Sequence, residues 1–438
     1  MSPGCVNLHG DLKYLWKKAL KGLYTGISQI IMEEIERSVL KIGIGHINIG
    51  DEERKAISEV LESGRISEHK KTREFETRWA KYTGRKYAVA TNSGTSALLL
   101  GLQTLLNDSR FPRIKKGGRV ITSPLTYTAT SNAIVLSGLE PVYIDIDPVT
   151  FTLQADRLED MLKKGGKKNC MVLPVHLMGY VNDMDAINML AEKYDLVTFE
   201  DAAQAHGSKY KGKMAGSLSL LSDFSFYIAH NIQAGEMGAI VTGDAKIQKL
   251  AKKLKANGRV CHCAVCTRSE GKCPYKNKNF DPRFTHEYIG YNFKTTEFQA
   301  ALALSQLNKV DRIINRRRRN VKYLNDRLLE FSDIFQLPVY SEDVSYLAYP
   351  IIIKKPKKLP RKKIMRELEN RGVEVRPLFG CIPTQQPAYR SLKKKYDRKL
   401  PNADYAGRNG FYIGCHQYLT GEDMEYIVRV FNEILKGI

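Results

Sequence analysis

Apolar positions along the chain follow two spacings, and their alternation predicts an α/β fold. From Ile49 to about Leu307, segments with apolar residues three and four positions apart, typical of helices, separate short runs that are almost continuously apolar. The predicted helices are residues 52–62, 72–82 and 95–106, and the predicted strands are residues 87–90, 119–122, 141–144, 171–174, 196–199 and 239–242. Since apolar strands separated by helices form sheets covered on both faces, we expect a mainly parallel sheet.

The same pattern divides the chain into three regions. Residues 1–44 are expected to form a helical N-terminal extension, because one helix face collects Leu20, Leu23, Ile27, Ile31 and Ile35. Residues 45–310 are expected to form a large domain. A long helix at 312–329 then leads into a smaller C-terminal α/β domain, residues 311–438, in which residues 354–363 are expected to be an exposed loop.

Composition and charge narrow the function classes. With 43% hydrophobic and 26% charged residues the 438-residue chain has an ordinary globular composition. It has neither a membrane-spanning apolar run nor, near its start, the apolar segment of a signal peptide, so we expect a cytoplasmic protein. The net charge is +22, and the basic residues form runs at 316–319, 354–363 and 393–395 that contain no interleaved aromatic residues. We therefore expect mainly solvated surface and a minor contribution to binding a phosphorylated substrate, with nucleic-acid binding as the less favoured alternative.

Four of the eight cysteines lie close together in a polar insertion at residues 258–275. Without a secretory leader, disulfide bonds are not expected. Four thiolates are the usual ligand set of an iron–sulfur cluster or of tetrahedral zinc, and the short spacing favours the cluster. The candidate ligands are Cys261, Cys263, Cys266 and Cys273.

Three segments carry candidate chemistry at the ends of predicted strands. The small residues at 91–97 could bring backbone N–H groups and a helix N-terminus to a phosphate, or could simply form a tight turn. Asp201 could hold the nitrogen of a pyridoxal ring in its protonated state, or could cap a helix. The segment 223–238 runs through aromatic residues to His230, and Ser225 precedes that histidine by five positions.

Together with residues 63–67, 74–76, 123–127 and 290–300, these segments resemble the DegT/DnrJ/StrS sugar aminotransferases. The resemblance runs from about Ile49 to the C-terminus and implies a fold-type I enzyme that uses pyridoxal phosphate. It implies that Gly94, Thr95 and Ser225 hold the cofactor phosphate. It also implies that Tyr127 stacks on the cofactor ring, that Asp201 pairs with the ring nitrogen and that Gln204 lies near the ring hydroxyl. In this family the residue matching Asn292 reaches the cofactor phosphate of the neighbouring subunit, which implies a homodimer.

One position departs from the aminotransferase pattern. His230 stands where the family carries the lysine that attaches the cofactor covalently. An imidazole cannot make that attachment but can move a proton near neutral pH. The same replacement marks the 4-keto-6-deoxyhexose 3-dehydratases, which use free pyridoxamine phosphate. The resemblance thus implies removal of the C3 hydroxyl of a nucleotide-linked 4-keto-6-deoxyhexose, with His230 as the acid/base and substrate contacts near Arg376.

Two branches of that subgroup compete. The CDP-4-keto-6-deoxyglucose 3-dehydratase type carries an iron–sulfur cluster, expected here as 2Fe-2S, and receives electrons from a separate reductase. The GDP-4-keto-6-deoxymannose type has no cluster and regenerates its cofactor with glutamate. The four cysteines favour the first branch, although its further cysteine ligand is replaced here by Ala202 or Ala203. The alternatives are a cluster-free dehydratase with zinc-bound cysteines and a degenerate aminotransferase fold serving as a binding or regulatory protein.

Overall fold

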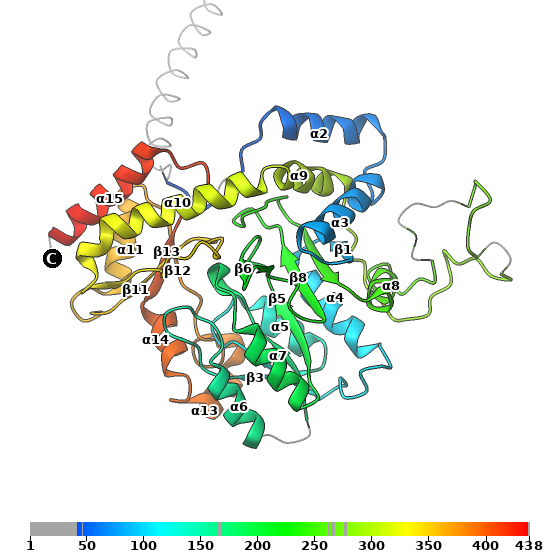
Figure 1. The fold of residues 1–438 in the computed structure, drawn as a ribbon, viewed down its shortest axis with the longest axis horizontal. Helices are drawn as coiled ribbons and strands as arrows, with labels where there is room; N and C mark the ends of the chain where they lie inside the picture. The colour runs from blue at the N-terminus through cyan, green and yellow to red at the C-terminus, as the bar shows by residue number, and fades with distance from the viewer. Residues whose placement is uncertain are drawn as a thin grey trace, which may run out of the picture.

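The computed structural model covers most of the chain, describing residues 42–45, 47–164, 168–261, 263, 268–275 and 278–436. The expected helical extension lies outside these residues except for its last three positions, and so does Cys266. The described residues form a large sheet and a small sheet joined by one long helix (Figure 1).

The large sheet, as described, has seven strands and is parallel except around one strand. Its order is β1 (Tyr87–Thr91), β9 (Gly238–Thr242), β8 (Leu221–Ser225), β5 (Val197–Asp201), β4 (Asn169–Leu173), β2 (Arg119–Thr122) and β3 (Glu140–Tyr143). Only β9 runs antiparallel to its neighbours β1 and β8. The predicted mainly parallel α/β sheet is confirmed, and the predicted strand positions agree to within a few residues.

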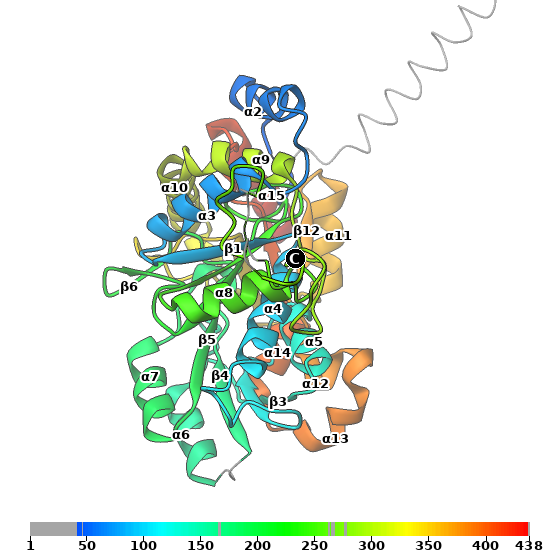
Figure 2. The ribbon, with the colours of Figure 1, turned by 90° about the vertical axis from the view of Figure 1, so that its right-hand side faces the viewer.

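Helices cover both faces of this sheet (Figure 2). One face packs against α4 (Gly94–Leu106), α5 (Ala129–Leu136) and α8 (Ala245–Leu254). The other packs against α3 (Lys70–Tyr82), α6 (Ala155–Lys164), α7 (Met184–Lys193) and α9 (Glu297–Leu307). The helix α2 (Asp51–Glu62) packs on α9. Contact with α4 is close, since a Cβ at Gly101 would lie 2.5 Å from the ring of Phe199. This packing fixes the N-terminus of α4 beside the strand ends.

The N-terminus of α3 is capped from a distant helix. The buried Glu297, at the start of α9, accepts hydrogen bonds from the backbone N–H groups of His69 (2.7 Å), Lys71 (2.7 Å) and Thr72 (3.0 Å). It also accepts one from the Thr72 hydroxyl at 2.6 Å. The carboxylate therefore supplies acceptors to N–H groups that a helix leaves without partners at its start.

Replacing Glu297 by alanine is expected to lower the free energy of unfolding by about 3 kcal/mol, because buried donors lose their acceptor. Urea unfolding followed by circular dichroism measures the change. Glu422→Ala, at an exposed position in the first turn of another helix, is the control and should change stability by less than about 0.5 kcal/mol. Equal effects of the two substitutions would contradict the capping role.

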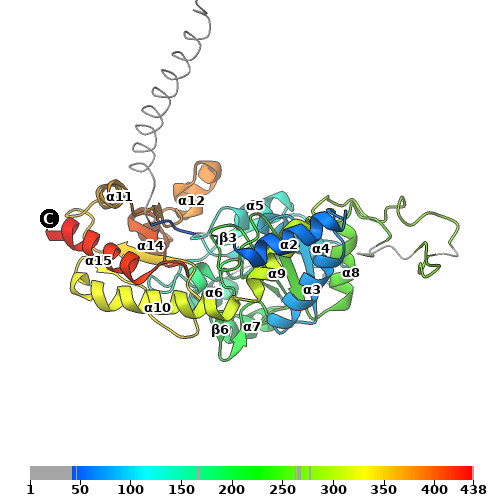
Figure 3. The same cartoon turned by 90° about the horizontal axis from the view of Figure 1, so that it is seen from above.

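The long helix α10 (Val310–Leu328) runs from the large sheet to the small one (Figure 3). Its Val310 and Ile314 pack in the apolar cluster that holds Trp79, whereas Val321, Leu324 and Leu328 pack with residues of the small sheet. That sheet is antiparallel, in the order β10 (Phe335–Gln336), β11 (Tyr349–Ile353), β13 (Gly410–Ile413) and β12 (Val375–Pro377). Around it lie α11 (Arg361–Asn370), α14 (Pro401–Asn409) and α15 (Gly421–Lys436). The division at residues 310 and 311 into two domains stays a prediction.

Short elements complete the described chain: η1 (Leu177–Gly179), β6 (Lys209–Tyr210), β7 (Lys213–Met214), η2 (Leu329–Phe331), α12 (Ile382–Gln385), η3 (Pro387–Leu392) and α13 (Lys393–Tyr396). Of the helices in the described ranges, none combines the length and the apolar character that a membrane span requires.

Two expectations about the basic runs need correction. Residues 354–363 are not all loop, because α11 begins at Arg361. The run 316–319 is not all solvated surface, since Arg317 is 0% exposed. Its guanidinium donates to the carbonyls of Tyr346 (3.2 Å) and Leu347 (2.7 Å), so a buried arginine fastens the segment that follows β10.

Candidate active site

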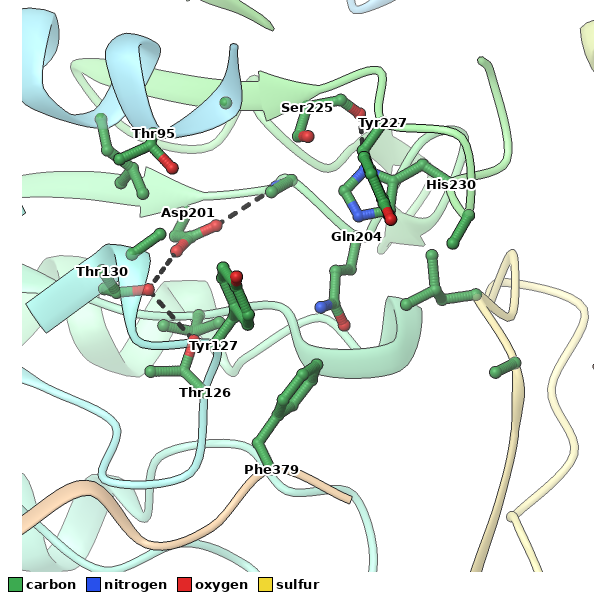
Figure 4. Close-up of a pocket in the computed structure, with 18 of the residues that line it drawn as sticks. Thr95, Thr126, Tyr127, Thr130, Asp201, Gln204, Ser225, Tyr227, His230 and Phe379 are labelled. Atoms are coloured by element: carbon green, nitrogen blue, oxygen red, sulfur yellow. Dashed lines mark hydrogen bonds between the residues drawn. The ribbon is translucent and has the colours of Figure 1, made fainter. Parts of the chain in front are cut away.

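A cavity of about 370 Å³ lies at the carboxyl ends of β5 and β8, between the large sheet and residues of the small sheet (Figure 4). In open α/β sheets, ligands bind at this edge. Sequence-predicted residues from five separate segments line this one cavity: Gly94, Thr95, Tyr127, Asp201, Gln204, Ser225, His230 and Arg376. The roles assigned to them individually stay predictions.

One end of the cavity is built for an anion. The N-cap of α4 is Ser93, whose hydroxyl accepts from the N–H of Ser96 at 3.1 Å, and the first two residues of the helix, Gly94 and Thr95, line the cavity. A Cβ at Gly94 would lie 2.5 Å from the Cβ of Ser225, a separation that real side chains do not tolerate. The glycine thus lets a helix N-terminus approach the Ser225 hydroxyl closely, and Thr95 adds a second hydroxyl. Such an arrangement suits a phosphate group.

Asp201 is a buried carboxylate at the floor of the cavity. Its Oδ2 accepts from the Thr130 hydroxyl at 2.7 Å and its Oδ1 from the N–H of Ala203 at 3.3 Å. Burial raises the pKa of Asp201, so a cationic group beside it would favour the ionised form. The residues after Asp201 form turns rather than a helix, which removes the alternative that it caps a helix.

His230 is oriented by the backbone of the strand that precedes it. Its Nδ1 lies 2.7 Å from the carbonyl oxygen of Ser225. Because a carbonyl oxygen only accepts, Nδ1 carries the proton and Nε2 keeps its lone pair. Burial lowers the pKa of His230 to about 4, with a further contribution from the charge of Arg317. His230 is therefore a neutral imidazole at physiological pH, able to take up a proton at Nε2.

The ring of His230 rests on a buried aromatic layer. His206, at a ring-centroid distance of 6.0 Å from His230, is stacked on Phe224 and Phe226. Tyr227 meets His230 edge-on at 6.0 Å. These rings restrict how far the His230 imidazole can rotate.

The lowered pKa of His230 predicts a pH dependence of stability. In the unfolded chain the imidazole binds a proton as the pH falls below about 6.5, whereas in the folded chain it does so only near pH 4. The unfolded state therefore binds more protons in this window, and the free energy of unfolding falls with decreasing pH by at most about 1.4 kcal/mol per unit for this group. Urea unfolding between pH 4 and pH 7 measures the slope, and His230→Asn should give a shallower one. Parallel slopes for the two proteins would contradict the shifted pKa.

Two further predicted residues have defined contacts. Gln204 accepts from the N–H of Met178 at 3.0 Å through Oε1, which leaves its amide nitrogen for the cavity. Tyr127 is 61% exposed and meets Phe379 edge-on with ring centroids 6.0 Å apart. Figure 4 shows Tyr127 on the side of the cavity opposite Ser225.

The sequence analysis missed several lining residues. Thr130 lies three positions after Tyr127, just beyond the segment that was singled out, so a hydroxyl close in sequence to the predicted ring contact was the signal that could have found it. Glu236 lies within the segment 223–238 and Phe379 lies three positions after Arg376, but neither was given a role. The others come from segments without a motif: Ile44, Leu347 and Tyr412.

Asn292 lies apart from the other predicted residues of the same chain. It lines a second cavity of about 410 Å³ together with Lys252, Lys255, Arg259 and Lys294. This position agrees with a contact to another subunit rather than to the chain's own cavity, but that contact stays a prediction.

The structure does not show the expected metal centre. Cys261, Cys263 and Cys273 border one small hollow with Arg268 and Arg283. Across the described ranges there is no group of three or more His, Cys, Asp or Glu residues arranged to hold a metal ion, and Cys266 lies outside those ranges. Ala203, one of the two positions where the cluster-bearing branch has a further cysteine, lines the main cavity instead.

The fold and cavity together define a fold-type I enzyme of the pyridoxal-phosphate-dependent class. The described residues fit that cofactor, because the cradle at Gly94 suits its phosphate and the buried Asp201 suits its ring nitrogen. The chain belongs to the DegT/DnrJ/EryC1/StrS aminotransferase family, whose model matches residues 47–432. It is thus an enzyme of the group that contains the sugar aminotransferases and 3-dehydratases.

Proteins named as 3-dehydratases and as perosamine synthases are both among the relatives that are similar to this chain. It is 31% identical to dTDP-4-dehydro-2,6-dideoxy-D-glucose 3-dehydratase of Saccharopolyspora spinosa, over 88% of this chain and 85% of the relative. It is 32% identical to GDP-perosamine synthase of Caulobacter vibrioides, over 83% and 89%. The structure of E. coli GDP-4-keto-6-deoxy-D-mannose-3-dehydratase with bound hydrated PLP matches with a TM-score of 0.79 at 27% identity, over 90% of this chain and 99% of that one.

Proposed function

We propose that this enzyme is a 3-dehydratase that removes the C3 hydroxyl of a nucleotide-linked 4-keto-6-deoxyhexose with the help of pyridoxamine phosphate. The observation that carries the proposal is His230 itself, a neutral imidazole whose Nε2 is available in the cofactor cavity. Aminotransferases of this family carry a lysine there. A histidine at this position supports proton transfer and excludes covalent attachment of the cofactor.

The cavity residues would divide the work as follows. The N-terminus of α4, with Thr95 and Ser225, would bind the cofactor phosphate, and Asp201 would pair with the ring nitrogen, oriented by Thr130. Tyr127 would cover the ring and Gln204 would lie near its hydroxyl. When bound, pyridoxamine phosphate would supply the amine that condenses with the sugar ketone, and its electron-poor ring would acidify the methylene C–H beside that amine, so that the electron pair released there expels the C3 hydroxyl.

His230 would take up the proton that leaves the exocyclic methylene carbon of the cofactor. Its Nδ1–H stays on the Ser225 carbonyl, so proton uptake occurs at Nε2 alone. The imidazolium formed there is disfavoured by burial, and it would readily return the proton to the leaving hydroxyl. One side chain would thus act first as a base and then as an acid.

The test is product formation. Purified protein is incubated with pyridoxamine phosphate, a chemical reductant in place of the reductase and, in turn, CDP-, dTDP- and GDP-linked 4-keto-6-deoxyhexoses, with and without glutamate, and the sugars are analysed by mass spectrometry. Loss of the C3 oxygen supports the proposal. An amino sugar formed in the presence of glutamate, without loss of that oxygen, would instead identify an aminotransferase, as the similarity to a perosamine synthase allows. If neither product forms with any of these substrates, the result would favour a binding or regulatory protein.

The source of electrons separates the two dehydratase branches. We propose the cluster-bearing branch, in which Cys261, Cys263, Cys266 and Cys273 bind iron and sulfide, and a reductase supplies the electron pair that the 3-deoxy product requires. The hollow shared by three of these cysteines supports this proposal. Iron, sulfide and zinc are measured after anaerobic purification. Zinc alone, together with consumption of glutamate during turnover, would identify the cluster-free branch.

We also propose that the active enzyme is a homodimer. Phe284 and Ile289 are 78% and 99% exposed beside the segment that carries Asn292, and large apolar side chains in such positions indicate a covered surface. Light scattering measures the mass in solution. A monomer would overturn the proposed contact of Asn292 with a neighbouring subunit.

A further inference from the structure

Residues 42–45 form a short strap between the small sheet and the loop that carries His230. Ile42 pairs with Val373 in a parallel bridge, in which the N–H of Ile42 donates to Gly372 (2.9 Å) and that of Glu374 donates to Ile42 (2.8 Å). At the other end, a Cβ on Gly45 would lie 2.8 Å from the Cα of Ala229, the residue before His230. The strap therefore contacts both sides of the cavity.

A single carboxylate joins this strap to Arg376. Oε2 of Glu374 accepts from the N–H of Ile44 at 2.8 Å. Oε1 accepts from Nε and Nη2 of Arg376 at 3.2 and 3.0 Å. Ile44 and Arg376 both line the cavity. Glu374 is only partly exposed and uses both of its oxygens in these contacts, so it fixes an apolar and a cationic wall residue relative to each other.

The ion pair between Glu374 and Arg376 also affects which ligand groups can bind to the part of the cavity that Ile44 and Arg376 line. The charges of Glu374 and Arg376 balance, so the pair as a whole offers N–H donors to the cavity but carries no net charge. Balanced donors of this kind suit neutral oxygens, such as sugar hydroxyl and keto groups, better than a phosphate. The neighbouring side chains of Ile44 and Phe379 add apolar surface for the carbon face of a hexose ring.

We infer that Glu374 is a positioning residue, which holds Arg376 and the strap so that together they bind the sugar ring of the substrate. The inference rests on the proposed function for the identity of the sugar. It adds the part of the cavity that holds the sugar and the residue that shapes it. Glu374 acts through Arg376 and Ile44 rather than by touching the reacting atoms.

Glu374→Gln is the first test, because the amide must turn its –NH2 group toward either the Ile44 N–H or the guanidinium, both of which are donors. The Kd of the nucleotide-linked 4-keto-6-deoxyhexose that the wild type binds best, and its KM where turnover is seen, are expected to rise about tenfold. The Kd of pyridoxamine phosphate should change by less than about twofold. Glu367→Gln is the control, since Glu367 on α11 pairs with Arg371, the residue that follows this helix, and both lie outside the cavity.

Arg376→Met tests the same contact from the other side and is independent of whether Glu374→Gln folds. Because Glu374 acts through Arg376 as well as through the strap, the loss of sugar affinity in the double variant is expected to be smaller than the sum of the losses in the two single variants. Additive losses, a loss of cofactor affinity in Glu374→Gln, or sugar affinities equal to the Glu367→Gln control would each overturn the inference. Because sugar binding is measured without turnover, failure of the proposed dehydration leaves this test readable.

Discussion

Replacing His230 by asparagine is expected to slow formation of the 3-deoxy product by about 10²–10⁴-fold, the usual contribution of a general acid or base. Asparagine can still donate to the Ser225 carbonyl, so the shape of the loop is retained, but it cannot take up a proton. Single-turnover product formation and a separate titration with pyridoxamine phosphate measure the two properties. Unchanged turnover would remove His230 from the chemistry, and loss of cofactor binding would make its role structural.

His230→Lys provides a second readout that does not depend on turnover. A lysine at this position places an amine in the cavity, where the aldehyde of pyridoxal phosphate would attach to it covalently. Borohydride reduction followed by peptide mapping detects the attachment. The wild type is expected to retain no cofactor after the same treatment.

Asp201→Asn is expected to weaken cofactor binding by about 10–100-fold, because a buried hydrogen bond to a charged group is lost while the side chain keeps its shape. Asp223 provides a matched control. It lies beside Asp201 on the adjacent strand β8, it is equally buried, and burial together with the Asp201 and Glu200 charges raises its pKa well above the ordinary value. Asp223→Asn therefore makes the same change in side-chain chemistry at an equally buried site where burial and the neighbouring carboxylates disfavour the ionised form.

Titration of each variant with pyridoxamine phosphate, followed by absorbance, measures the affinity. The expected outcome is a large loss for Asp201→Asn and less than a twofold change for Asp223→Asn. Similar losses for both variants would indicate that packing, and not the charge of Asp201, governs binding. An unchanged affinity in Asp201→Asn would remove its proposed pairing with the ring nitrogen.

The sequence predicted the layout of the large sheet because buried strands and amphipathic helices leave different apolar spacings. It could not predict that β9 runs antiparallel between β1 and β8, since a central strand is equally apolar in either direction. Arg317 shows a second limit. Its partners are carbonyls of Tyr346 and Leu347, and no local pattern reveals acceptors that lie so far along the chain.

Some residues of the candidate site could likewise be predicted from the sequence, and others could not. Residues at strand ends, such as Asp201 and Ser225, were found because they sit in recognisable segments, and the fold brings them into one cavity. Ile44 and Tyr412 were missed because they reach the cavity only through tertiary packing of the small sheet. The cysteine segment was found by its spacing, but spacing alone does not give the arrangement of the thiols.

The path of α10 has a consequence for protein engineering. Because its first turns pack with Trp79 and its last turns with the small sheet, this helix belongs to both halves of the molecule. In a chimaera joined at residue 330, α10 would come from one parent, and its last turns would pack against the small sheet of the other parent. Crossing over at Asn308 and Lys309 instead transfers α10 whole, so that within this helix only the contacts of its first turns with the large sheet combine residues of the two parents.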